Sequence, residues 1–99
     1  MTVSPIPDGA TIVAASDVLA TEFGDEVVLL NLRDGVYYGL EDVGTRIWQL
    51  VQQPVSVLAI REALVAEFDV ESARCERDIR LLLTDLVAKG LVEIRGEAR

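Results

Sequence analysis

The sequence predicts one small α+β domain, in which a three-stranded antiparallel β-meander is followed by three α-helices and a short C-terminal strand. The chain has 99 residues, 51% of them hydrophobic, which suits a soluble domain with a single core. Up to residue 40, apolar residues form short runs separated by turn residues, as in strands joined by tight connections. From residue 42 onward, apolar residues recur at helical spacing.

Three short apolar runs make up the expected meander. The first covers residues 18–23 and is closed by Gly24-Asp25, and the second covers residues 26–32. Arg33-Asp34-Gly35 then makes a tight connection to residues 36–40, because Asp-Gly is a strong hairpin signal. Consecutive strands are neighbours in a meander, so the third run is expected at an edge of the sheet.

This third run lacks the usual protection of an edge strand, since it contains neither Lys nor Pro. Two interpretations follow from the residues alone. In the first, a helix covers the strand or the strand is simply short. In the second, the edge of the strand is open to pairing with another chain.

Side chains alternate between the two faces of a strand, so each strand's faces can be assigned. In the second strand, one face carries Val28, Leu30 and Leu32, and the other carries Val27, Leu29 and Asn31. In the third, one face carries Val36, Tyr38 and Leu40, and the other carries Tyr37 and Gly39. Because the two tyrosines differ in face, at most one ring is expected to touch a ligand.

Start and stop signals place the three helices. They are expected at residues 42–53, from Ser56 to about Phe68, and from about residue 72 to Lys89. Pro54 stops the first, Ser56 is a good N-cap for the second, and Gly90 stands where a C′ glycine belongs after the third.

The two ends of the chain frame this domain. Residues 1–16 contain Pro5, Pro7 and Gly9 and are expected to form an extended arm, with room for a short strand near Thr11 to Ala14. The domain proper is expected at residues 17–95, including an alternating strand at residues 91–94, and a polar tail at 96–99.

Apolar residues of the third helix do not all fall on one stripe. Cys75, Ile79, Leu82, Leu83 and Leu86 form one face, which is the expected core seam. Leu81 lies off this seam, and its neighbours at helical spacing are Arg74, Asp78 and Asp85. Leu81 is therefore either an ordinary exposed leucine or the rim of a groove.

Composition excludes several function classes. With 17 Asp and Glu against 9 Lys and Arg, the net charge is −8, which disfavours nucleic acid as a partner. The chain has no His and one Cys, so His-based general bases, nucleophilic dyads and zinc sites have no residues to build them. We therefore expect a binding protein that is not an enzyme and has no cofactor or metal.

Two further features of the sequence predict the cellular compartment of the protein. A lone cysteine, Cys75, cannot form an internal disulfide, and no signal-peptide pattern opens the chain, which together favour the reducing cytoplasm. Apolar runs are far shorter than the ~20 residues that cross a bilayer, so no membrane span is expected.

Three stretches of the sequence resemble the PqqD-like family. They are residues 37–50 (YYGLEDVGTRIWQL), a helix ending AEFDV at residues 66–70, and LTDLVAKGLV at residues 83–92. The resemblance implies a winged-helix-like domain that recognises the leader of a ribosomally made, post-translationally modified precursor peptide. A free-standing chain of this size is similar to the leader-binding protein of lasso-peptide clusters, which works with a separate leader peptidase and a cyclase. A peptide chaperone in a radical-enzyme pathway is the alternative within the family.

The resemblance also implies where the peptide binds. A leader would add as an antiparallel strand to Val36–Leu40 and lie in a groove against the third helix, a mode known as β-augmentation. Helix positions facing it would be Arg74, Asp78, Leu81 and Asp85, with Val28 and Leu30 as the floor. The expected peptide-binding residues are thus Val28, Leu30, Val36, Tyr37, Tyr38, Gly39, Leu40, Arg74, Asp78, Leu81 and Asp85.

A winged-helix DNA-binding regulator is the rival from another class. Its support is the row Arg74, Arg77 and Arg80 along the third helix. Acidic residues interrupt this row at Glu71, Glu76, Asp78 and Asp85, which leaves no basic face for phosphates.

Trp48 lies at a helix flank, where an aromatic residue more often packs than binds.

Overall fold

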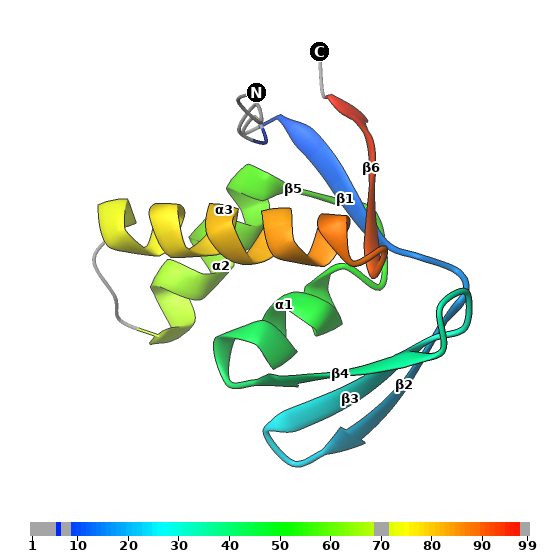
Figure 1. The fold of residues 1–99 in the computed structure, drawn as a ribbon. Coiled ribbons are helices and arrows are strands. Elements are labelled where there is room, and N and C mark those ends of the chain that lie inside the picture. Colours follow the sequence, from blue (N-terminus) through cyan, green and yellow to red (C-terminus); the bar gives the residue numbers. More distant parts are fainter. Residues whose placement is uncertain (1–5, 7–8, 69–71, 98–99) are drawn as a thin grey trace.

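Two three-stranded antiparallel sheets and three helices make up the fold (Figure 1). The computed structural model describes residue 6 and residues 9–68 and 72–97, without the side chains of residues 72–75 and 97. In chain order the elements are β1 (Ala10–Ala14), β2 (Val18–Phe23), β3 (Glu26–Asn31), β4 (Val36–Glu41), α1 (Val43–Leu50), β5 (Val55–Ser56), α2 (Val57–Phe68), α3 (Ser72–Ala88) and β6 (Val92–Glu97). The predicted α+β class, meander, three helices and C-terminal strand are confirmed, and the likeness to a winged helix stays a prediction.

The meander forms the sheet β2-β3-β4, as the turn residues predict. Gly24 has φ +62° in the two-residue turn between β2 and β3, a conformation that glycine adopts without strain. In the loop before β4, Gly35 has φ +70° and its amide donates to the Asn31 carbonyl oxygen (2.8 Å). The Asp34 carboxylate accepts a hydrogen bond from the Val36 amide (2.9 Å). Hydrogen bonds therefore hold this loop both to the end of β3 and to the start of β4.

A second sheet, β5-β1-β6, was not predicted. Its central strand is β1, which contains the short strand expected near Thr11 to Ala14, and β1 pairs antiparallel with β6 from the other end of the sequence. Ala10 and Ile12 have no exposed surface. Local sequence signals do not encode such long-range pairing, and the division of the chain into arm, domain and tail stays a prediction.

Helix ends follow the predicted caps. The Ser56 hydroxyl accepts a hydrogen bond from the Ala59 amide (3.0 Å), which confirms it as the N-cap of α2. After α3, Gly90 has φ +72°, and amides of Gly90 and Leu91 donate to the carbonyl oxygens of Val87 and Leu86, the pattern of a Schellman motif. None of the described helices combines the length and the apolar character needed to cross a membrane.

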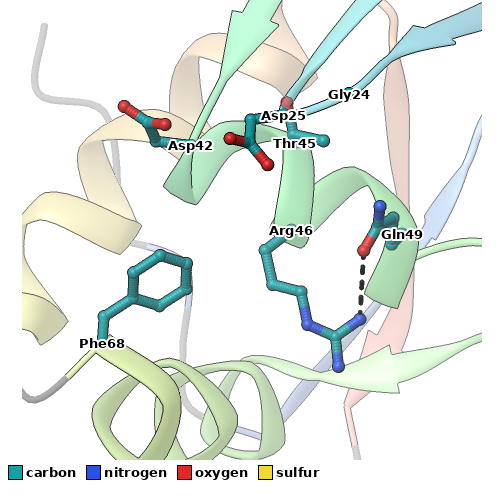
Figure 2. A pocket seen from close by; sticks show the side chains of 7 residues that line it. All are labelled: Gly24, Asp25, Asp42, Thr45, Arg46, Gln49 and Phe68. Atoms are coloured by element: carbon teal, nitrogen blue, oxygen red, sulfur yellow. Dashed lines mark hydrogen bonds between the residues drawn. The ribbon is translucent and has the colours of Figure 1, made fainter.

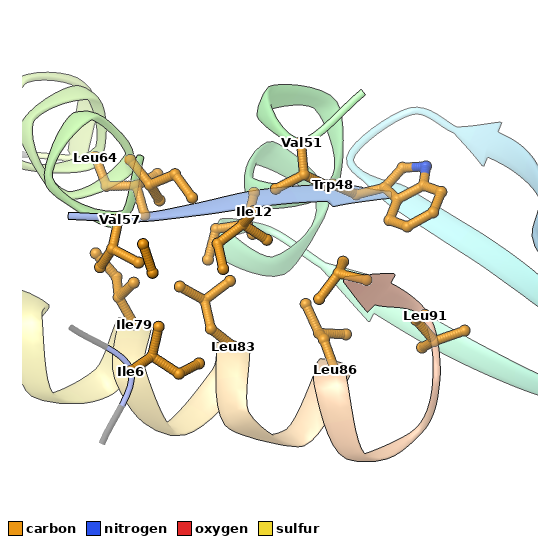
Figure 3. Packing of buried hydrophobic residues seen from close by; sticks show 14 of the residues in the cluster. Ile6, Ile12, Trp48, Val51, Val57, Leu64, Ile79, Leu83, Leu86 and Leu91 are labelled. Carbon is orange, nitrogen blue, oxygen red and sulfur yellow. The ribbon is translucent and has the colours of Figure 1, made fainter. Parts of the chain in front are cut away.

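One core joins the two sheets and the helices (Figure 3). Ile12 of β1 packs with residues of α1 and α3, and Trp48 is 3% exposed, which confirms its packing role. Within α3, Ile79, Leu83 and Leu86 are buried whereas Leu81 is 67% exposed, as the helical projection predicted. The rigid core therefore sets the position of α3 relative to the meander.

Candidate functional site

One of the two free edges of the meander is β4, which pairs only with β3 in the part of the chain that the structure describes. Beyond the end of this pairing, the Asp42 amide donates to the Asp25 carbonyl oxygen (3.1 Å), which fixes the phase of the ladder. Hydrogen-bonded and non-hydrogen-bonded pairs alternate in antiparallel strands. Every second residue of β4 therefore points its main-chain N–H and C=O away from β3, and these residues are Tyr37, Gly39 and Glu41.

The side chains of β4 divide between two different surroundings. Tyr38 and Leu40 lie on the face that carries the buried Leu29 and Val27, and they pack against the core. Tyr37 and Gly39 lie on the opposite, outer face, where Tyr37 is 69% exposed. The two tyrosine rings therefore lie on opposite faces of the sheet, as the alternation predicts.

Tyr38 links β4 to the C-terminal part of α3. Its hydroxyl donates to the Asp34 carboxylate (3.3 Å), and the Lys89 ammonium lies 5.2 Å from the centre of its ring. Partial burial of the phenol is the main cause of the raised pKa of Tyr38, and the negative charge of Asp34 raises this pKa further. Lys89 is held by an ion pair with Asp85, one turn earlier (2.8 Å).

Farther along β4, Leu40 approaches α3 past a glycine of α1. A Cβ built on Gly44 would lie 3.4 Å from the Leu40 Cβ and 3.8 Å from a methyl carbon of Leu82. Gly44 therefore occupies the narrow space between these two leucines, in agreement with Figure 1, where α1 lies between β4 and α3. We define Tyr38, Leu40, Leu82, Asp85 and Lys89 as the β4–α3 surface.

Two side chains fasten the loop before β4 to the end of α3. The buried Asn31 side-chain amide donates to the Lys89 carbonyl oxygen (2.9 Å) and its oxygen accepts from the Arg33 amide (2.9 Å). The Arg33 guanidinium donates to the Gly90 carbonyl oxygen (3.1 Å) and pairs with Asp17 (2.9 Å). These contacts fix the distance between β4 and α3.

The structure brings together some of the predicted site residues. Tyr38, Leu40 and Asp85 meet at the β4–α3 surface, while Val36 lies at the exposed start of β4. Asp78 and Leu81 are exposed on α3, and the side chains of Arg74 and Cys75 lie outside the described part of the structure.

Val28 and Leu30 do not form the floor of this surface. They pair with Gly39 and Tyr37 and share the outer face of the sheet with them, because β3 turns the alternate residues, Val27 and Leu29, toward the core. Sequence reasoning also missed Leu82 and Lys89. Lys89 follows Asp85 by one helical turn and lies on the same face of the helix as Asp78 and Asp85, so the helical spacing could have identified it.

A separate cavity of about 290 Å³ lies beyond the C-terminal end of β4 (Figure 2). It is lined by Gly24, Asp25, Asp42, Thr45, Arg46, Gln49 and Phe68. The Arg46 guanidinium is already engaged by both carboxylate oxygens of Glu67 (2.8 and 3.1 Å) and by Gln49 (3.3 Å). None of the predicted peptide-binding residues lines this cavity.

Two solved structures resemble this fold and contain a bound peptide. One is TbiB1 in complex with the TbiA(beta) leader peptide, at 38% identity and a TM-score of 0.77, covering 88% of this chain and 99% of that chain. The other is lasso peptide synthetase B1 complexed with the leader peptide, at 28% identity and a TM-score of 0.73, covering 83% and 96%. No curated protein sequence matches the chain.

A family model agrees with these structures. The model described as coenzyme PQQ synthesis protein D (PqqD) matches residues 26–92, which run from the start of β3 through all three helices to the start of β6. This match includes β4, α3 and the whole β4–α3 surface, so the chain belongs to the PqqD family.

Proposed function

We propose that this protein binds the leader region of a ribosomally made precursor peptide in lasso-peptide biosynthesis, by adding the leader as a strand to β4. The observation that carries the proposal is the free edge of β4, where Tyr37, Gly39 and Glu41 offer main-chain donors and acceptors to a further strand. In β-augmentation such bonds supply affinity, and side-chain contacts supply specificity.

Specificity on one face would come from the β4–α3 surface. Leu40 and Leu82 offer apolar contact, while Asp85 and Lys89 offer charge one to two turns farther along α3. Leu81 and Asp78 stand exposed on the same helix and extend this surface away from the core. The two similar structures are each a complex with a leader peptide, which supports leader binding as the function.

The proposal also includes the biosynthetic pathway and the way in which the protein acts in it. Similarity to two B1-type leader complexes favours the lasso pathway over a peptide chaperone of radical enzymes and over a DNA-binding regulator. The protein acts by binding, not by catalysis, and delivers the precursor to a separate leader peptidase or modifying enzyme in the cytoplasm.

Proline substitution tests the edge directly. Gly39→Pro removes an amide that points away from β3, so the meander keeps its own bonds while the added strand loses one. Ala20→Pro is the matched control, because the Leu32–Asp17 hydrogen bond sets the phase of the β2–β3 ladder so that the Ala20 amide also faces outward, from the opposite edge. The probe is a synthetic candidate leader peptide, and its binding is measured by isothermal titration.

We expect Gly39→Pro to weaken leader binding by about tenfold or more, because the added strand loses one main-chain hydrogen bond. The circular dichroism spectrum should stay unchanged. Ala20→Pro should bind like the wild type. Equal affinities for all three proteins would place the peptide elsewhere.

A further inference from the structure

The outer face of β4 has an opening at Gly39. A Cβ built on Gly39 would meet no atom within 4 Å, and its φ lies outside the left-handed region. Across the sheet, Gly39 pairs with Val28, which in turn pairs with Thr21 of β2. Because Gly39 has no side chain, a side chain of a peptide strand paired with β4 can reach across it to Val28.

Apolar and acidic residues border this opening on its two sides. Toward the loop, Tyr37 pairs with Leu30, which pairs with Leu19, and Tyr37 and Leu19 are 69% and 58% exposed. Toward the other end, Glu41 pairs with Glu26. No described element covers this face, whereas the inner face packs on the core.

We propose that this opening is a specificity site for one large apolar side chain of the bound peptide, preferably aromatic, packed over Gly39 onto Val28 and beside Tyr37. This inference rests on the proposed function, because the site is continuous with the β4 edge. The peptide residue that exchanges both main-chain bonds with Gly39 has its side chain on the outer face.

The geometry sets the size of that side chain. Strands in a sheet lie ~4.8 Å apart, so a peptide paired with β4 lies ~9.6 Å from β3. The side chain of an alanine or serine in the peptide is too short to reach across Gly39 to Val28, whereas an aromatic side chain is long enough. Covering a strand glycine with a neighbouring aromatic side chain is a known stabilising arrangement in sheets.

Gly39→Val separates this role from a structural one. A valine fits without steric conflict and favours a strand more than glycine does, so the thermal unfolding temperature should stay the same or rise. The valine would fill the opening and exclude the large side chain. Thr21→Val is the matched control, since Thr21 lies in the same row and on the same face but at the opposite edge.

The test is a displayed library of random 12-residue peptides, selected separately on the wild type, Gly39→Val and Thr21→Val. Enriched peptides are first checked for amide protection of β4, and their pairing register is determined by nuclear magnetic resonance. We expect the position opposite Gly39 to be aromatic or large aliphatic with the wild type and with Thr21→Val, and to become small with Gly39→Val. Replacing that residue by alanine in one enriched peptide should weaken wild-type binding by about tenfold or more, and binding to Gly39→Val far less.

The outcomes distinguish the two claims. Peptides that pair along β4 but show the same side-chain sizes on the wild type and on Gly39→Val would overturn the specificity site and leave leader binding intact. A failure to enrich any peptide that protects β4 would contradict the proposed function, and this inference with it.

Discussion

The side-chain amide of Asn31 donates a 2.9 Å hydrogen bond to the main-chain carbonyl oxygen of Lys89, which ties the end of β3 to the end of α3. Asn31 is 2% exposed, and Lys89 is the residue whose ammonium lies over the Tyr38 ring. One buried amide thus holds together the strand edge and the helix that the proposed leader would contact.

Replacing Asn31 should therefore destabilise the fold. Asn31→Ala leaves the Lys89 carbonyl oxygen and the Arg33 amide without this partner, at a cost of about 1–3 kcal/mol in the free energy of unfolding. Arg33→Ala should cost less than about 1 kcal/mol, because its side chain is 61% exposed where it pairs with Asp17. Urea denaturation measures both, and equal losses would show that the buried amide is not the stronger tie.

Leu81 tests whether the exposed rim of α3 touches the peptide. Because Leu81 is 67% exposed, Leu81→Asp should change the free energy of unfolding by less than about 0.5 kcal/mol. If the leader contacts this rim, its affinity should fall by about tenfold or more, since an apolar contact is replaced by a charge.

Leu58→Asp is a suitable control for that variant, since Leu58 is an exposed leucine near the start of α2, where an acidic residue is compatible with the helix dipole. In a reconstituted reaction, Leu81→Asp should slow leader cleavage at low precursor concentration and recover when the precursor is raised. Wild-type leader affinity in a folded Leu81→Asp protein would remove this rim from the site.

Acid should weaken the contact between α1 and α2. Hydrogen bonding to Arg46 lowers the pKa of the Glu67 carboxyl, so Glu67 is more acidic in the folded chain than in the unfolded chain. The pair therefore stabilises the fold above the ordinary carboxyl pKa, and this contribution is lost as the pH falls through the lowered folded value. Glu67→Gln should be less stable than the wild type at neutral pH and lose less stability on acidification. Parallel curves of stability against pH would contradict this account.

Local signals in the sequence predicted most elements because each acts over a few residues. The Asp34-Gly35 turn, the Ser56 cap and the Gly90 terminator each act within one turn of chain, and all are present. The central position of β1 depends on its pairing with β6, across almost the full length of the chain, so periodicity could not reveal it.

The candidate site shows the same division. Alternation correctly separated Tyr37 and Gly39 from Tyr38 and Leu40, but it could not say which face meets α3. For this reason Val28 and Leu30 were expected beneath the groove beside α3, whereas they lie on the outer face with Gly39 and Tyr37. The packing of α1 between β4 and α3 decides the matter, and it depends on the small size of Gly44.

Amide hydrogen exchange along β4 tests the central claim most directly. In the free protein, the amides of Tyr38 and Leu40 are bonded to β3, while those of Tyr37, Gly39 and Glu41 face outward. Nuclear magnetic resonance with the bound leader should show strongly slowed exchange at Tyr37, Gly39 and Glu41 and no change at Ala20 and Glu22 on the opposite edge. Unchanged exchange at the three outward amides of β4, or slowing along β2 instead, would contradict strand addition at this edge.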